Sequence, residues 1–136
     1  MVFGVFDRLH PGHISFLEQA AGLGDELVVA VARDSIVQKL KQRTSIESEH
    51  LRVNRVKDMT CVTRAILGDE QLSSYDVIKV HQPDIICLGY DQKWIKQDIE
   101  DQMAKGLLPQ IQLCVADAHE PERLHTSLLT ASHPLI

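Results

Sequence analysis

Two histidines, His10 and His13, stand three residues apart where an apolar run turns into a helical pattern. Residues 1–6 predict a short buried strand, and Pro11 or Gly12 is the expected first position of the helix. Both imidazoles then lie beside the free amides of the helix N-terminus, where the positive end of the helix dipole attracts anions. Imidazole N–H groups can also stabilise charge that develops on phosphate oxygens during transfer. The turn therefore predicts a site for nucleotide phosphates.

The same two histidines have two other interpretations. An arbitrary pair at this spacing is most often a turn histidine and a first-turn helix histidine without a ligand. A metal site is less well supported, because no third His, Cys or carboxylate follows at ligand spacing. Asp7 and Gly12 bracket the turn, however, and an amphipathic helical pattern over Ile14–Ala21 follows it. This setting favours phosphate chemistry over both alternatives.

Composition and charge limit the classes of function. A length of 136 residues suits a single domain over residues 1–136, with a substantial core. The net charge of −5 disfavours non-specific nucleic-acid binding, so a local cluster of cations would have to hold an anionic substrate. The three cysteines are far apart and lack a CxxC pair, which argues against a disulfide framework and a zinc site. We expect no signal peptide, no membrane contact and a cytoplasmic location.

Apolar strand-like runs alternate with helical patterns along the chain, which favours an α/β fold. After the first strand, further strands are expected at Glu26–Arg33, Arg64–Gly68, Asp84–Gly89 and Gln110–Val115, the last toward an edge. After the first helix, further helices are expected near Glu47–Asp58, Ser74–Val80 and Ile95–Lys105, the first of these opened by a capping box at Thr44–Glu47. This order predicts a doubly wound parallel sheet with ligands beyond the C-terminal ends of the strands.

Polar residues that directly follow strands are the ones placed to reach such a ligand. Four groups meet this criterion: Asp7–His13, Asp34–Arg43, Gly89–Gln92 and His119–Ser127. In the second group, Lys39, Lys41 and Arg43 form a basic stretch that can neutralise a triphosphate, although a solvated polar loop has about equal weight on charge alone. Asp34 is placed like the acidic residue that binds ribose in dinucleotide folds, but the GxGxxG fingerprint is absent. Capping of the short helix after it is at least as plausible.

The turn from Gly4 to His13 resembles the GxFDxxHxGH signature of the cytidylyltransferase-like nucleotidyltransferases, which have a Rossmann-like fold. Four further segments look most like the archaeal-type FAD synthase branch of this family: Leu23–Asp34, Val37–Lys41, Arg64–Gly68 and Pro83–Gln92. The resemblance extends from about Val2 to Cys114. It implies in-line attack of a substrate phosphate on the α-phosphorus of a nucleoside triphosphate, with release of pyrophosphate and no covalent enzyme intermediate. It also implies Mg²⁺ bridging the triphosphate oxygens, and relatives commonly form homodimers.

The resemblance further implies roles for individual residues. His10 and His13 would bind the phosphates and stabilise the transition state, whereas Lys39 or Lys41 and Arg52 would hold the triphosphate. Without the resemblance, Arg52 is equally well interpreted as a surface arginine of a helix. The residues expected to contact the nucleotide lie at the strand ends and in the last signature: Val5, Phe6, Asp7, His10, His13, Lys39, Lys41, Gly89, Asp91, Thr126 and Ser127.

The last signature of the family is altered in this chain. Relatives usually carry ISSTxxR at the start of the last helix, where hydroxyls, amides and the arginine meet the β- and γ-phosphates. Here Thr126 and Ser127 match, but His125 replaces the first serine and no arginine follows. Loss of a bidentate cation would remove transition-state stabilisation. Reduced or absent activity is therefore one of the expectations.

Three functions remain open at this point. The leading hypothesis is an FAD synthase that transfers AMP from ATP to FMN. The same scaffold in glycerol-3-phosphate cytidylyltransferases uses CTP and a small sugar phosphate, and the few aromatic residues of this chain weaken the flavin interpretation slightly. The third hypothesis is a degenerate nucleotide-binding protein without turnover, which the altered last signature suggests.

Overall fold

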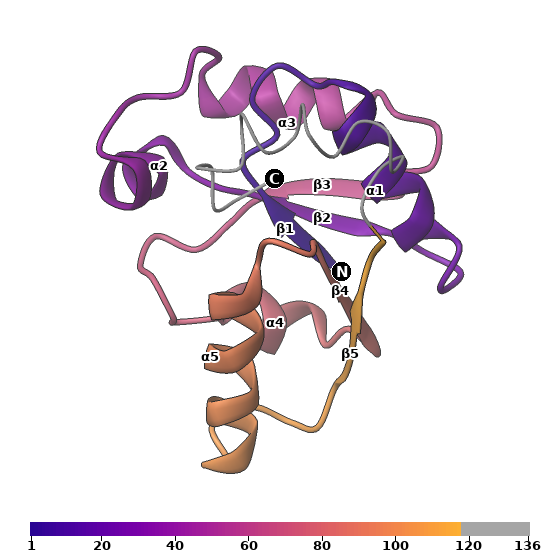
Figure 1. Cartoon of the computed structure of the whole chain (residues 1–136), viewed down its shortest axis with the longest axis vertical. Helices are drawn as coiled ribbons and strands as arrows, with labels where there is room; N and C mark the ends of the chain where they lie inside the picture. The colour runs from indigo at the N-terminus through magenta and orange to yellow at the C-terminus, as the bar shows by residue number, and fades with distance from the viewer. Residues whose placement is uncertain (118–136) are drawn as a thin grey trace.

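The structure is a computed structural model that describes residues 1–117, in which helices cover parallel β-strands (Figure 1). The elements in chain order are β1 (Val2–Gly4), α1 (Pro11–Ala21), β2 (Val28–Val31), α2 (Asp34–Lys41), α3 (Glu49–Lys57), β3 (Arg64–Leu67), α4 (Asp76–His81), β4 (Ile85–Leu88), α5 (Lys93–Ala104) and β5 (Gln112–Val115). This alternation of strands and helices confirms the predicted α/β class. The strands are shorter than predicted, and the residues left outside them include apolar ones such as Val5, Phe6 and Leu27.

All strands are parallel to their neighbours, and they form two sheets that meet at β1 and β4. The first sheet has the order β1-β2-β3, and Val29 of β2 lies between Val2 of β1 and Ala65 of β3. The second sheet pairs β4 with β5. The two sheets are joined where the Cys87 amide donates to the Met1 carbonyl at 3.0 Å. The spatial order is therefore β3-β2-β1-β4-β5, with a switch point between β1 and β4.

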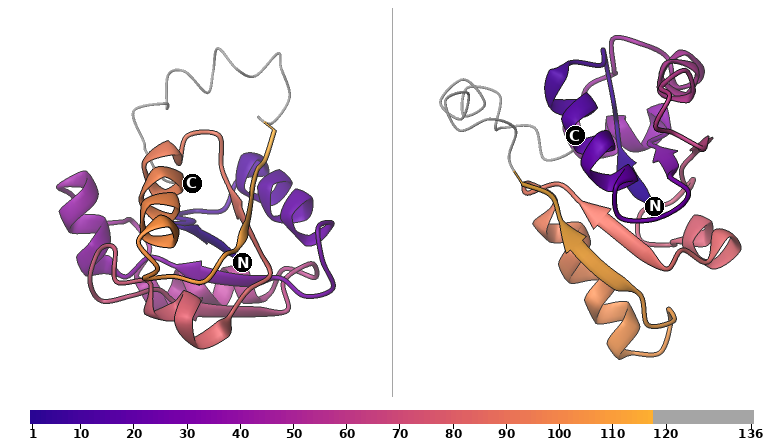
Figure 2. Two further views of the ribbon diagram at one scale, coloured as in Figure 1. Left: turned by 90° about the horizontal axis from the view of Figure 1, so that it is seen from below. Right: turned by 90° about the vertical axis from the view of Figure 1, so that its right-hand side faces the viewer.

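Helices cover both faces of the strands, with α1 and α3 on one face and α4 and α5 on the other (Figures 1 and 2). One apolar cluster contains Phe16 and Leu17 of α1 and Val56 of α3. The second cluster contains Ile78 of α4 and Ile99 of α5. Val37 of α2 belongs to the second cluster, so α2 packs on the face of α4 and α5. Burial of these side chains against β-branched strand residues supplies most of the stabilisation of the fold.

The start of α3 differs from the predicted capping box. Ser48 is the N-cap, and its side chain accepts a hydrogen bond from the Leu51 amide at 3.3 Å. Ser45 donates instead to Asp34 and to the Glu47 carbonyl. The prediction of a Thr44–Glu47 box was therefore wrong, because Ser45 bonds to Asp34 and the Glu47 carboxylate accepts from the Arg8 amide. In the described part of the chain, no helix has the length and apolar character needed to cross a membrane.

Candidate active site

The two histidines form a stacked pair at the N-terminus of α1. Pro11 is the first residue of the helix, and His10 is its N-cap. The Nδ1 atom of His10 accepts a hydrogen bond from the Gly12 amide at 3.1 Å, which fixes the orientation of the ring. The rings of His10 and His13 stack with centroids 3.7 Å apart and an interplanar angle of 22°. The predicted phosphate-binding turn is thus brought together in one place, with His10 exposed and His13 behind it.

His13 is buried, with only 6% of its surface exposed. Its ring meets the ring of Phe6 edge-on, with centroids 5.5 Å apart. Burial, followed by the nearby His10 and Lys41, lowers the pKa of His13 to about 3. The imidazole is therefore neutral at pH 7, and its Nδ1 atom is buried without a hydrogen-bond partner. A buried polar atom without a partner is uncommon, which makes His13 a candidate for contact with a ligand.

The C-terminus of α2 brings a cation to the same place. Lys41 is half-buried, and burial lowers its pKa, with the positive charge of Arg43 as the next cause. The carboxylates of Asp7 and Asp91 act on Lys41 in the opposite direction. Lys41 thus lies within electrostatic reach of the turn after β1 and the loop after β4. Lys39, the other predicted triphosphate ligand on this helix, is exposed.

The loop after β4 lines the switch point between the two sheets. Gln92 is fully buried, and its side chain donates to the Phe3 carbonyl at 2.9 Å and accepts from the Gly89 amide at 2.8 Å. This amide group bridges β1 and β4 where their ladder has ended. The Oδ1 atom of Asp91 is buried without a partner, and burial raises the pKa of this carboxyl. In the described part of the chain, the two buried polar side-chain atoms without a partner, on His13 and Asp91, therefore belong to the segments that follow β1 and β4.

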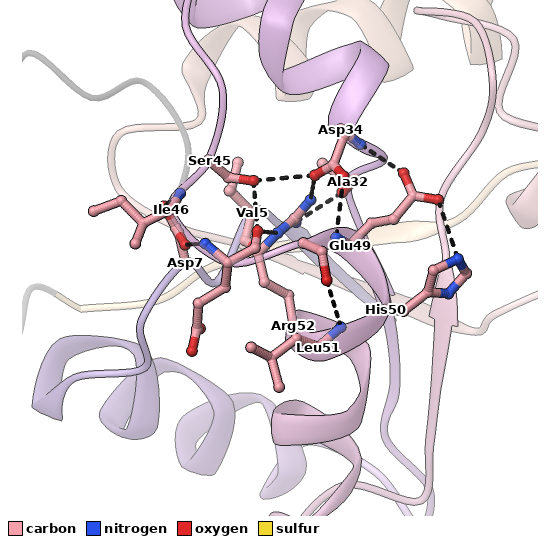
Figure 3. A network of polar contacts seen from close by, with 12 residues as sticks. Val5, Asp7, Ala32, Asp34, Ser45, Ile46, Glu49, His50, Leu51 and Arg52 are labelled. Carbon is pink, nitrogen blue, oxygen red and sulfur yellow. Dashed lines mark hydrogen bonds and ion pairs between the residues drawn. The ribbon is translucent and has the colours of Figure 1, made fainter.

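Asp7 has a structural task in addition to its predicted place near the nucleotide. Its two carboxylate oxygens accept hydrogen bonds from the amides of Ile46 and Glu47, at 2.8 and 2.9 Å (Figure 3). The residues on either side of it, Phe6 and Arg8, both have φ of 54°, in the left-handed region that side chains other than glycine rarely adopt. The bonds of Asp7 hold this strained turn in place. They also fasten the segment that precedes α3 to the histidine turn.

Arg52 lies at the centre of a buried network (Figure 3). None of its surface is exposed, and its guanidinium donates to the carbonyls of Val5 and Ala32, each at 2.8 Å. It also donates to the Glu47 carbonyl at 3.1 Å and to Asp34 at 2.7 Å. The interpretation of Arg52 as a surface arginine was therefore wrong. Its contact with a triphosphate stays a prediction, whereas its protein bonds show that it ties together the ends of β1, β2 and the start of α3.

Asp34 connects the same network to both neighbouring helices. Its amide donates to the Glu49 carboxylate at 2.8 Å, and its own carboxylate accepts from the Glu49 amide at 3.2 Å. Bonds from Arg52 and Ser45 lower the pKa of Asp34 against the opposing effect of burial. The side chain of Asp34 makes no capping bond to α2, whose N-cap is Arg33, so the predicted cap of that helix was wrong. Asp34 satisfies the first amide of α3 instead.

The structure places the remaining predicted residues in different ways. Val5 and Phe6 directly follow β1 and are both buried, Val5 in the apolar cluster of α4 and α5 and Phe6 in the cluster of α1 and α3. Thr126 and Ser127, with the whole group His119–Ser127, lie outside the described residues.

The buried role of Arg52 had a signal in the sequence, because it lies four residues before the core residue Val56 and so on the same face of α3. No described group of three or more His, Cys, Asp or Glu side chains is arranged to hold a metal ion.

Comparisons with known proteins agree with this geometry. The family model for cytidylyltransferase-like proteins matches residues 1–130. An FAD synthase of Aciduliprofundum boonei is 49% identical over 105 residues, which are 77% of this chain and 69% of the relative. An FAD synthase of Methanosarcina barkeri is 48% identical over 107 residues, covering 78% and 74% of the two chains.

A solved structure from Thermoplasma volcanium, described as a lipopolysaccharide core biosynthesis protein, superposes with a TM-score of 0.80 at 37% identity. The superposition covers 88% of this chain and 96% of that one. The histidine turn, the parallel strand order and the family match all support the same family. This chain belongs to the cytidylyltransferase-like family.

Proposed function

We propose that this protein is an FAD synthase, a nucleotidyltransferase that transfers AMP from ATP to FMN and releases pyrophosphate. The observation that carries the proposal is the stacked His10–His13 pair at the N-terminus of α1, with the Nδ1 atom of His13 buried and unpartnered. Similar proteins named FAD synthase, 42–49% identical to this chain, support the choice of ATP and FMN.

The reaction needs no covalent group on the enzyme. An oxygen of the FMN phosphate attacks the α-phosphorus of ATP, the bond between the α- and β-phosphates breaks, and the electron pair leaves with pyrophosphate. The protein has to align the two phosphates and stabilise the negative charge between them. His10 is prepared for this task, because its Nδ1 accepts from the Gly12 amide and the proton of the neutral ring is then on Nε2. That N–H donates to a phosphate oxygen.

The other groups supply charge. Lys41, close to His13 and Asp7, offers a cation to the triphosphate, and the dipole of α1 adds partial positive charge at its first turn. His13 is neutral in the folded protein, so it binds phosphate as a hydrogen-bond donor rather than as a cation. An approaching anion raises its affinity for a proton.

The described residues fit a Mg²⁺ ion that arrives with ATP. Magnesium usually binds through one or two carboxylates together with substrate phosphates and waters. Asp91 has a buried carboxylate oxygen without a partner, and it is the residue that would hold the ion. When bound, the ion neutralises phosphate charge. The single-domain organisation, a homodimeric state and a cytoplasmic location are further proposals, based on the sequence.

A product assay tests the function. The purified protein is incubated with Mg²⁺ and each combination of ATP or CTP with FMN or glycerol 3-phosphate, and products are separated by chromatography. We expect FAD and pyrophosphate from ATP and FMN alone, no FAD from His10→Ala, and normal activity from the matched control His50→Ala, an exposed histidine of α3. CDP-glycerol from CTP would contradict the proposal in favour of a cytidylyltransferase. Triphosphate binding without product from FMN would support a protein that binds nucleotide without turnover.

A further inference from the structure

A pocket with a volume of about 90 Å³, partly open to solvent, lies on the face of β1 and β2 opposite α1. Most of the groups that line it are apolar, and they come from β1, β2, α2, α5 and the loop after β3: Phe3, Ala32, Ile36, Leu40, Tyr75 and Trp94. Its largely apolar lining with a few polar groups is typical of a site for a small organic ligand, and its open side leaves room for a ligand that extends beyond it. None of the roles assigned above to the phosphate-binding groups uses it.

The pocket adjoins the phosphate site through three chain segments. Leu40 of α2 lines the pocket, and the next residue, Lys41, is the cation near the histidines. Trp94 of α5 lines the pocket three residues after Asp91, which has a buried carboxylate oxygen without a partner. Gly4, at the end of β1, lines it just before the chain enters the histidine turn. A ligand with an apolar end and a phosphate end therefore suits the two sites together.

The shape of that ligand follows from the lining. Three aromatic residues, Phe3, Tyr75 and Trp94, surround the pocket, which favours a planar ring that can stack or meet them edge-on. Glycerol phosphate has no apolar group to fill such a space. Adenine carries nitrogen atoms around most of its edge, whereas isoalloxazine has a dimethylbenzene end that suits a hydrocarbon lining.

One wall of the pocket also offers polar groups. Asp69 and Gln71 line it, and the Asp69 carboxylate accepts from the Val77 amide at 3.0 Å, which fixes its orientation. The pyrimidine edge of isoalloxazine carries one N–H and two carbonyls. A carboxylate and an amide side chain can satisfy these groups.

The same wall is held in place before any ligand arrives. The hydroxyls of Ser73 and Tyr75 both donate to the Asp98 carboxylate of α5, each at 2.6 Å. Both residues have φ in the left-handed region, 64° and 50°, and the shared carboxylate holds this strained backbone. A preformed wall lowers the entropy cost of binding.

We propose that this pocket binds the isoalloxazine ring of FMN and selects a flavin as the acceptor, while the phosphate of FMN reaches the His10–His13 pair. This inference rests on the FAD synthase function proposed above. Ala32 and Trp94 provide two independent ways to test it, because one substitution fills the pocket and the other removes part of its wall.

The test compares Ala32→Leu and Trp94→Ala with the wild type and with a control. Leu23→Ala is the matched control, since Leu23 is 43% exposed and Trp94 37% exposed, and Leu23 lies after α1, away from the pocket. FMN and riboflavin binding are measured by quenching of flavin fluorescence, ATP binding by calorimetry, and folding by urea unfolding. FAD formation by the wild type is measured in parallel.

We expect both pocket variants to raise the dissociation constants of FMN and riboflavin by about tenfold or more, with ATP affinity changed by less than about twofold. The control keeps wild-type values. The inference is overturned if a folded Ala32→Leu and a folded Trp94→Ala bind FMN like the wild type, or if ATP affinity falls instead, which would place adenine in the pocket. In both cases FAD formation by the wild type leaves the proposed function standing. A wild type that makes no FAD refutes the function, and the inference with it.

Discussion

Replacing Arg52 by methionine tests the network that joins the ends of β1 and β2 to α3. Methionine fills much of the same volume, but it leaves the carbonyls of Val5, Ala32 and Glu47 without their donor. Removing one partner of a buried ion pair usually costs about 3–5 kcal/mol, and each unsatisfied buried acceptor about 1–3 kcal/mol. The Asp34 side chain is 44% exposed, so water can solvate it after the substitution. The total loss of stability is therefore smaller than these separate costs added together. We therefore expect the free energy of unfolding to fall by about 3–5 kcal/mol.

Urea unfolding followed by circular dichroism at pH 7 measures this loss as a lower midpoint at constant slope. The matched control is Arg55→Met on the same helix. The Arg55 side chain is 52% exposed, and its partner Glu47, although only 11% exposed, keeps its hydrogen bond from the Arg8 amide, so we expect a loss of about 1 kcal/mol. Equal effects of the two substitutions would refute the reasoning. An Arg52→Met protein of unchanged stability but weakened ATP binding would instead support the predicted contact with the triphosphate.

Two further predictions concern the histidine pair. In Gly12→Ala the new Cβ would lie 3.0 Å from Cε1 of His10, so the ring must shift by a few tenths of an ångström, and kcat should fall by about threefold to tenfold. The urea midpoint should stay or rise because alanine favours the helix, and an unchanged kcat would contradict the role of the stack. For His13, the pKa is about 3 when folded and 6.5 when unfolded, so the unfolded chain binds the proton first. The contribution of neutral His13 to the free energy of unfolding is therefore present above about pH 6.5. It decreases as the pH falls below that value, and the loss reaches about 2 kcal/mol at pH 5. The pH dependence of urea unfolding checks this against His13→Gln, and equal slopes in the two proteins would show that His13 does not titrate as described.

Local patterns in the sequence predicted much of the architecture. The β-branched run that contains β2 and the apolar run that contains β4 indicated buried parallel strands, because such strands are covered on both faces. Pro11 after a short strand indicated the start of α1, since proline suits the first position of a helix. The spacing of His10 and His13 then placed both rings at that helix terminus.

Other features depend on contacts that no local pattern contains. Phe6 and Arg8 carry no signal for a left-handed backbone, and they adopt it because Asp7 between them is bound by two amides about 40 residues away. The sequence before α3 is compatible with a capping box, but Ser45 donates to Asp34 instead, and the Glu47 carboxylate accepts from the Arg8 amide. The apolar pocket was not foreseen either, since its lining comes from five separate segments.

The sequence by itself determined the order of the elements and the histidine turn, because hydrophobic periodicity and helix-start residues act over a few positions. Only the tertiary structure decided that His13 stays neutral well below pH 6.5, since its pKa depends on burial, on the stacked His10 and on Lys41 from another helix. It also decided the place of Arg52, whose acceptors Val5 and Asp34 lie 47 and 18 residues away along the chain. Buried polar groups must find partners wherever the fold brings them, and those partners cannot be read from sequence neighbours.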